Sequence, residues 1–102
     1  MPPHKTPGRG EIWLVDSRLC LVISNSVINE HRRTVVVIPL SSSPQEAPPL
    51  LVRVTCAGQP AMAVIDQVRA VAKERLTNLQ ERCSAKDLES VEAALREVLE
   101  LD

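Results

Sequence analysis

The strongest constraint on the fold is a pair of short apolar stretches separated by only two residues. Residues 11–16 and 19–24 each have the length of a strand, and the first carries Trp13, the one aromatic residue of the chain. Two strands joined so closely pair as an antiparallel hairpin. Arg18 stands at the entrance of the second strand. It is either a solvated turn charge or a fixed cation at a phosphate site, because the guanidinium fork matches phosphate oxygens.

Further short strands follow along the chain. The β-branched run 34–38 is apolar on both faces and predicts a central strand that ends at Pro39, which has no backbone donor. The other predicted elements are a polar connection at 24–33, a strand at 50–56 with Arg53 and Thr55 on one face, a turn at 57–60, a strand at 62–66 that 67–71 continues or follows, and a helical turn at 73–79.

The C-terminal segment has the pattern of an amphipathic helix that ends near Leu99. Ser84 is a candidate N-cap and Asp87 takes the third position of a capping box. Apolar residues then recur at helical spacing: Leu88, Val91, Leu95 and Val98, with Leu99 widening the stripe. This face packs on the sheet or binds a partner.

Five or six short strands and one terminal helix predict a mainly β fold, a small curled sheet or barrel. With 102 residues the chain is long enough for one domain. We expect residues 1–8, which hold three prolines, to be a flexible arm and residues 9–102 to be the domain.

Composition narrows the function. The chain has no Phe and no Tyr, which argues against RNA-binding folds that stack bases on rows of aromatic side chains. From Lys86 onward six acids face two bases, whereas the rest holds ten bases and seven acids. This mildly basic body permits a nucleic-acid partner.

Cysteine and histidine offer little chemistry. The three cysteines form no CxxC pair and are expected to be buried, inert thiols in a reducing compartment. The two histidines provide no zinc ligand set, so no metal site is expected. No apolar run is long enough for a membrane span, and the N-terminus is not a secretory signal. A cytoplasmic protein is therefore expected.

Several polar residues stand at the ends of strands. Ser41 and Ser42 follow the central strand, where a hydroxyl is held on a rigid scaffold or simply belongs to a connector. The pair Arg32-Arg33 is a solvated loop or contacts an RNA backbone. Asp66, Gln67 and Arg69 are bunched between apolar runs.

Four segments, in this order, resemble the MazF/PemK family of toxin endoribonucleases. They are Arg9-Gly10-Glu11-Ile12-Trp13, the stretch from Arg18 to Asn25, Val36-Val37-Ile38-Pro39-Leu40-Ser41-Ser42, and Asp66-Gln67-Val68-Arg69-Ala70-Val71 with Lys73 and Arg75-Leu76 after it. The resemblance extends from about Arg9 to Leu101.

The resemblance implies an SH3-like β-barrel with a C-terminal helix, usually a homodimer. The implied activity is metal-independent and cofactor-free cleavage of single-stranded RNA, often mRNA at short motifs, to 2′,3′-cyclic phosphate and 5′-hydroxyl ends. A cognate antitoxin peptide normally blocks the site of these toxins, and such toxin–antitoxin complexes bind DNA.

The resemblance also implies roles for individual residues. Arg18 matches the catalytic arginine of the family, and Ser41 falls at its catalytic threonine, so both would contact the scissile phosphate. Carried over in the same way, the RNA-binding residues would be Asn25, Ser42, Asp66, Gln67 and Arg69.

The chain departs from the family pattern at three points. Ser41 replaces threonine and is less restrained at χ1, and Leu19 replaces the proline that usually follows the arginine. The loop between the first two strands shrinks to Asp16 and Ser17. In many members this loop gates the groove and carries a catalytic acid, so we expect a more open groove here, in which Asp16 is the one nearby substitute.

Two other functions fit the same pattern. One is a non-catalytic toxin on this barrel that binds DNA gyrase through its terminal helix. The other is a relative that keeps RNA or antitoxin binding and has lost turnover, as the short loop and Leu19 suggest. Truncation of the tail and an assay of RNA cleavage distinguish these functions from an active ribonuclease.

Overall fold

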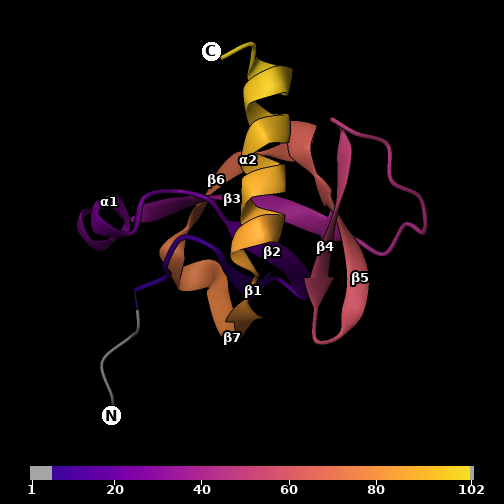
Figure 1. Cartoon of the computed structure of the whole chain (residues 1–102). Helices are drawn as coiled ribbons and strands as arrows, with labels where there is room; N and C mark the ends of the chain where they lie inside the picture. Colours follow the sequence, from indigo (N-terminus) through magenta and orange to yellow (C-terminus); the bar gives the residue numbers. More distant parts are fainter. Residues whose placement is uncertain (1–5, 102) are drawn as a thin grey trace.

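The computed structural model describes residues 6–101 and is mainly β with a C-terminal helix (Figure 1). The helices are α1 (Ser26–His31) and α2 (Ala85–Leu99), and two 3-10 turns are η1 (Ile65–Gln67) and η2 (Lys73–Arg75). The strands are β1 (Glu11–Val15), β2 (Arg18–Val22), β3 (Thr34–Ser41), β4 (Leu51–Cys56), β5 (Gln59–Val64), β6 (Arg69–Ala72) and β7 (Leu76–Arg82).

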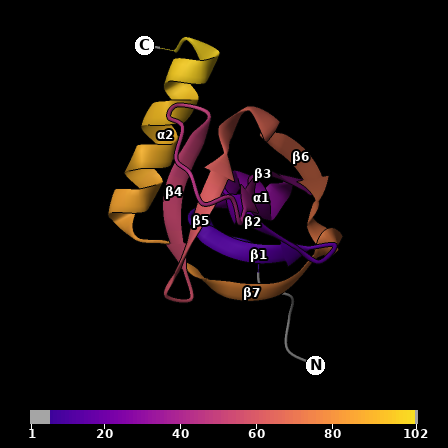
Figure 2. The same ribbon diagram turned by 90° about the vertical axis from the view of Figure 1, so that its right-hand side faces the viewer.

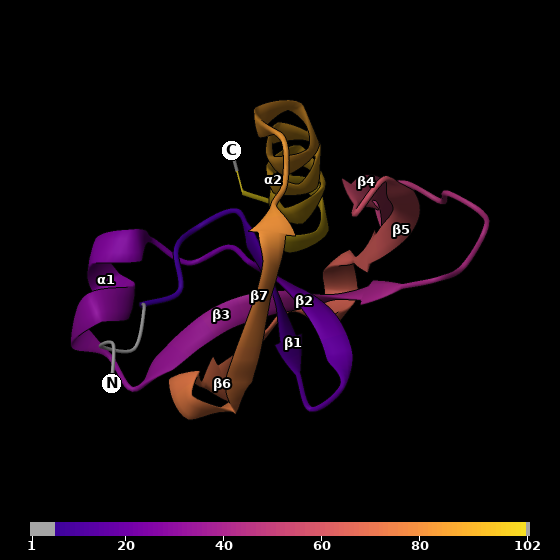
Figure 3. The same cartoon turned by 90° about the horizontal axis from the view of Figure 1, so that it is seen from below.

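All strand pairs are antiparallel, and the sheet runs in the order β4-β5-β3-β2-β1-β7, with β6 also paired to β3. Figure 2 shows the strands curling around a common interior, with α2 outside the curl beside β4. Seen from below in Figure 3, α1 and the β4–β5 hairpin lie at opposite ends of the molecule. The predicted fold, a curled barrel-like sheet with one terminal helix, is confirmed.

The sheet has an apolar core on each face. Ile12, Leu21 and Ile38 belong to a cluster completed by Val91 and Ala94 of α2. Their strand neighbours Trp13, Cys20 and Val37 belong to a second cluster. Successive side chains of a strand point to opposite faces, so these central strands need apolar residues at every position. The prediction of a central strand at 34–38 is therefore confirmed.

β3 is longer than predicted, because Pro39 does not end it. Pro39 is the last residue of β3 that pairs with β2, opposite Cys20, and the next residues pair with β5 instead. A proline is tolerated at this change of partner, where the ladder is interrupted in any case. The extension carries Leu40 and Ser41 to the edge of the functional site.

The predicted connection over residues 24–33 is wrong, because it contains α1. Asn25 caps this helix, and its side-chain oxygen accepts hydrogen bonds from the backbone N–H groups of Val27 (2.8 Å) and Ile28 (3.2 Å). Asn29 is fully buried and donates to the carbonyl oxygen of Pro7 at 2.9 Å. A helix of six residues is too short to have a clear hydrophobic period, and polar bonds define it instead.

Two boundaries near the second hairpin also differ. The predicted turn at 57–60 narrows to Ala57 and Gly58, whose positive φ angles of 54° and 75° suit a two-residue hairpin turn. Gln59 and Pro60 are therefore the first residues of β5. This strand ends at Val64 instead of continuing to residue 66.

The predicted helical turn at 73–79 is correct only for η2. The following residues form β7, a strand that the sequence analysis missed. β7 pairs with β1 at the end of the sheet order, and two register shifts interrupt the pairing. Most of its side chains are exposed, so it lacks the alternation of apolar and polar residues that indicates a strand.

The terminal helix begins and ends as predicted. The Ser84 side chain accepts from the Asp87 N–H at 3.0 Å, while the Asp87 carboxylate accepts from the Thr55 N–H at 2.9 Å and so joins α2 to β4. Val91 and Ala94 are buried against the sheet. Leu99 does not widen the stripe as predicted, because it is 50 % exposed.

Residues 1–5 of the predicted arm lie outside the described residues, whereas residues 6–8 lie against the domain. Pro7 is buried, and the Gly8 N–H donates to Glu11 Oε1 at 2.6 Å. The buried Glu11 also accepts from Trp13 Nε1 at 3.2 Å. In the described part of the chain, no helix is long and apolar enough to cross a membrane.

Candidate functional site: an arginine and two serines at an open cavity

The β1–β2 turn presents Arg18. Asp16 and Ser17 form the turn with φ angles of 50° and 71°, and the left-handed conformation at both positions closes a hairpin whose twist matches that of its strands. Arg18 is the first residue of β2 and pairs with Val15. Its side chain is exposed while its backbone is held in the sheet, so the cation extends from a rigid base.

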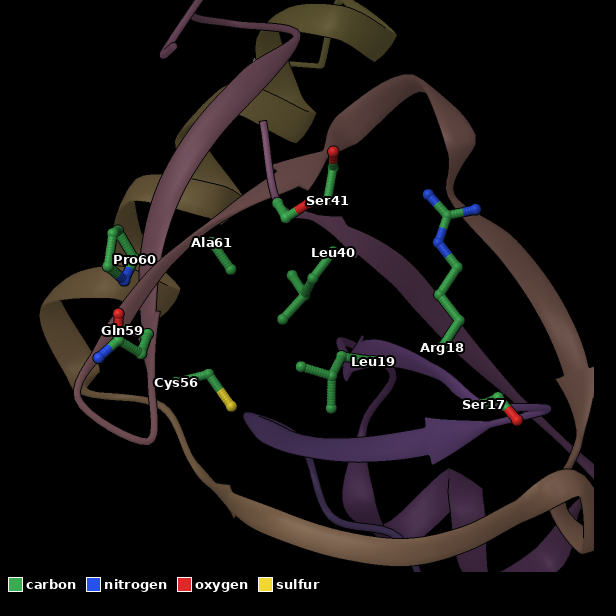
Figure 4. Close-up of a pocket in the computed structure, with 10 residues that line it drawn as sticks. Ser17, Arg18, Leu19, Leu40, Ser41, Cys56, Gln59, Pro60 and Ala61 are labelled. Atoms are coloured by element: carbon green, nitrogen blue, oxygen red, sulfur yellow. The ribbon is translucent and has the colours of Figure 1, made fainter. Parts of the chain in front are cut away.

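A cavity of about 330 Å³ opens beside this turn. Its polar lining includes Arg18, Ser41, Ser42 and Gln59. Figure 4 shows Arg18 and Ser41 on the same side of the cavity, across from Gln59. The remaining lining residues are Ser17, Leu19, Leu40, Cys56, Pro60 and Ala61.

Ser41 is held in place by its own backbone neighbours. It is the last residue of β3, pairs with Met62 of β5 and is half-buried. Its Oγ accepts a hydrogen bond from the Ser43 N–H at 3.1 Å. The hydroxyl hydrogen therefore stays available to a ligand oxygen in the cavity.

Three arginines gather around the start of β2. Burial raises the pKa of the Cys20 thiol, while the charges of Arg69, Arg18 and Arg75 act on it in the opposite direction. Arg69 begins β6 and Arg75 ends η2, so segments far apart in the sequence bring positive charge to the same region. This region is suited to a polyanion such as a nucleic-acid backbone.

One of the three arginines is already paired. Arg75 Nε donates to Asp16 Oδ2 at 2.9 Å, and its terminal nitrogen also contacts that oxygen. This hydrogen bond is the main reason why the pKa of Arg75 is raised. The acid of the short turn is therefore engaged in an ion pair, with a partner 59 residues away that the sequence does not indicate.

The structure brings together only part of the predicted site. Arg18, Ser41 and Ser42 line the cavity. Asn25 lies at the start of α1 as its cap, and Asp66 and Gln67 lie in η1. The roles of Asn25, Asp66, Gln67 and Arg69 in RNA binding stay predictions.

The residue that the sequence analysis missed is Gln59. The sequence indicates a turn near it, but the pairing of β5 with the last residues of β3 is what brings the hairpin to the cavity. Such a pairing between distant segments leaves no local signal. Within residues 6–101, no group of three or more His, Cys, Asp or Glu residues is arranged to hold a metal ion.

Fold and site together define a class: a small curled β-sheet domain with a terminal helix, whose sheet edge presents an arginine and hydroxyl groups to an open cavity. The family model described as "PemK-like, MazF-like toxin of type II toxin-antitoxin system" matches residues 8–99. The chain belongs to this family.

Solved structures agree with this assignment at the level of the fold. An endoribonuclease from Mycobacterial species superimposes with a TM-score of 0.86 at 21 % identity, covering 95 % of this chain and 94 % of the other. The MazE–MazF complex of Deinococcus radiodurans gives 0.84 at 20 % identity, covering 96 % and 100 %.

A Mycobacterial endoribonuclease in complex with its cognate antitoxin also gives a TM-score of 0.84, at 20 % identity, covering 97 % of this chain and 98 % of the other. Relatives have thus been crystallised with their antitoxins. No curated protein matches the sequence.

Proposed function

We propose that this protein is the toxin of a type II toxin–antitoxin system and cleaves single-stranded RNA, mRNA above all, without a metal ion or cofactor. One observation supports this most directly: Arg18 of β2, Ser41 of β3 and Ser42, which follows β3, line one cavity. A cation and hydroxyl donors so arranged match the charge and the oxygens of a phosphodiester.

RNA brings its own nucleophile to this site. The 2′-hydroxyl oxygen attacks the adjacent phosphorus, the bond to the 5′-oxygen breaks, and the products carry a 2′,3′-cyclic phosphate and a 5′-hydroxyl. Arg18 would offset the charge that builds on the phosphate oxygens. Ser41, whose Oγ is held by the Ser43 N–H, would donate its hydrogen to one of them.

Proton transfer is the weaker part of this site. Among the described residues that line the cavity, none carries a carboxylate or an imidazole. Asp16 is close in sequence but is paired with Arg75. We therefore assign the catalysis to positioning and charge stabilisation. We expect water to take the proton of the 2′-hydroxyl and to return a proton to the departing 5′-oxygen, which makes the reaction slow.

Partners follow from the same assignment. We infer that the RNA backbone leaves the cavity toward Arg69, whose charge acts on Cys20 as that of Arg18 does and which has no ion-pair partner among residues 6–101. By analogy with the solved complexes, an antitoxin peptide would block the cavity. As the family resemblance implies, two copies of the chain would form a homodimer, and we expect it in the cytoplasm. Sequence selectivity is part of this proposal.

The first test is Arg18→Ala. We expect it to reduce cleavage of a long single-stranded RNA by about 10³-fold, since it removes the cation that stabilises the transition state. The matched control is Arg53→Ala, another exposed arginine on a strand, which pairs with Glu46 away from the cavity and should keep full activity. Full activity of a folded Arg18→Ala variant would refute the site.

A second candidate function is a non-catalytic toxin that binds a protein target such as gyrase through the end of α2. The exposure of Leu99 and Leu101, at 50 % and 59 %, favours it. Removal of residues 100–102 distinguishes the two. Loss of toxicity with intact fold, and no RNA cleavage by the full chain, would replace the ribonuclease proposal with this one.

A further inference from the structure

The cavity has a second polar end that the proposed chemistry does not use. Gln59 is the first residue of β5 and pairs with Cys56 across the hairpin. Its side chain is exposed and lies on the side of the cavity opposite Arg18 (Figure 4). Among the described residues its amide has no hydrogen-bond partner, so both its donor and its acceptor are available to a ligand.

The floor between the two ends is apolar. Leu19, Leu40 and Ala61 come from three different strands and lie between Arg18 and Gln59 (Figure 4). Leu40 and Ala61 are only 5 % and 9 % exposed, so their side chains are held by the core. The floor is thus a rigid aliphatic surface bounded by a cation at one end and an amide at the other.

A nucleotide has the same order of groups. Its phosphate is anionic, the two faces of its base are apolar, and the edge of the base carries hydrogen-bond donors and acceptors side by side. The cavity volume of about 330 Å³ is at the small end of ligand sites, which suits a single base better than a longer segment.

We propose that Gln59 is a specificity-determining residue that reads the nucleobase next to the phosphate held at Arg18 and Ser41. This inference rests on the proposed ribonuclease function and adds the base subsite to it. The amide offers one donor and one acceptor to the base edge, as glutamine does when it pairs with adenine. Leu19, Leu40 and Ala61 contact the face of the base. Trp13 cannot stack on the base, because it is buried in the core on the opposite face of the sheet.

The experiment maps cut sites in an RNA pool with a randomised segment, for the wild-type chain and for Gln59→Leu. The substitution keeps the size of the side chain and removes both hydrogen-bonding groups. We expect the wild type to prefer one base at a position adjoining the cut. Gln59→Leu should lower this preference about tenfold, because one paired amide gives discrimination of that order.

The matched control is Gln80→Leu, an exposed glutamine of β7 that does not line the cavity, and its cut-site preference should equal that of the wild type. In parallel, the side-chain NH₂ signals of Gln59 are followed by NMR during titration with a dinucleotide that lacks the 2′-hydroxyl. These signals should shift, and those of Gln80 should not.

Each other outcome contradicts a defined part of the account. If the wild type cleaves and Gln59→Leu keeps the same preference, the base subsite is refuted while the ribonuclease function stands. If Gln59 and Gln80 signals are equally unmoved by the dinucleotide, the subsite is refuted independently of turnover. If the folded wild type cleaves no RNA, the proposed function fails and the inference fails with it.

Discussion

At the scale of single residues, both side chains of the site extend from backbone positions that the sheet fixes. Arg18 follows a turn with two left-handed residues, and the Ser41 hydroxyl oxygen accepts a hydrogen bond from the Ser43 N–H. The Ser41 hydroxyl is therefore preorganised, which lowers its cost of binding. The exposed side chain of Arg18 still loses rotamer freedom when it binds.

Ser41 offers a test of this preorganisation. Ser41→Ala removes the hydroxyl donor and should lower the cleavage rate constant by about 10²-fold, as loss of one transition-state donor does elsewhere. Ser41→Thr keeps the hydroxyl and should restore most of the rate, because β-branched residues fit a strand. The rates are compared in single-turnover assays at saturating protein. Equal rates for the alanine variant and the wild type would remove Ser41 from the mechanism.

At the scale of elements, the Asp16–Arg75 ion pair joins the β1–β2 hairpin to η2. The pair lies beside the arginines near Cys20 and neutralises one of them. This ion pair lies at the short turn, where the family pattern implies a long loop. The pair neutralises part of the positive charge of the proposed RNA-binding surface.

Asp16→Asn tests which role the acid has. Asparagine tolerates the left-handed φ of 50° and cannot hold Arg75 as an ion pair. The freed guanidinium should strengthen RNA binding several-fold and steepen the salt dependence of log K by about 0.7, the value for one further phosphate contact on a single strand. The measurement is RNA binding against salt concentration.

Asp16→Asn should change the stability of the fold little, since the pair is exposed. The contrary result is an unchanged affinity combined with a loss of cleavage of about 10²-fold or more. That outcome would make Asp16 the general base and would contradict the assignment of proton transfer to water.

At the scale of the whole molecule, two cores share one sheet, and the three cysteines are buried in them. Burial raises the pKa of each thiol above its ordinary value, and for Cys56 and Cys83 the nearby acids Glu81 and Asp87 add to this effect. The thiols therefore ionise less readily in the folded chain than in the unfolded chain. As a result, the free energy of unfolding depends on pH in the alkaline range.

The raised pKa values of the thiols stabilise the folded chain at lower pH and cease to do so at higher pH. The stabilisation is complete below the unfolded thiol pKa and is lost as the pH rises toward the folded value, because only the unfolded chain releases protons there. For each thiol, the free energy of unfolding therefore falls across that range. The chain has no Tyr, so few other groups titrate in this range.

Urea denaturation at about pH 7.5 and about pH 9.5 measures this loss. The wild type should be less stable at the higher pH. Each single Cys→Ala variant should lose less between the two values, whatever its stability at the lower pH. A free energy of unfolding that is equal at both pH values would show that the folded thiols ionise as freely as the unfolded ones.

Prediction from the sequence succeeded where a signal is local. The hairpin around Asp16 and Ser17, the central strand and the capped terminal helix all have short-range patterns, and the structure confirms them. It failed for α1, which is held by the polar bonds of Asn29, and for β7, whose exposed side chains do not alternate. At the site, Arg18 and Ser41 are indicated by their positions at the ends of predicted strands. Gln59 is not indicated, because only the pairing of β3 with β5 brings it to the cavity.

The central claim is that the 2′-hydroxyl of a bound RNA attacks the phosphate held at Arg18 and Ser41. The most direct measurement uses a short single-stranded RNA cut once by the protein in the presence of EDTA, beside the same strand with one 2′-deoxynucleotide on the 5′ side of the cut. The account predicts a cyclic phosphate and a 5′-hydroxyl from the all-RNA strand, and no cut in the modified strand. Cleavage of the modified strand, or products with a 5′-phosphate, would contradict it.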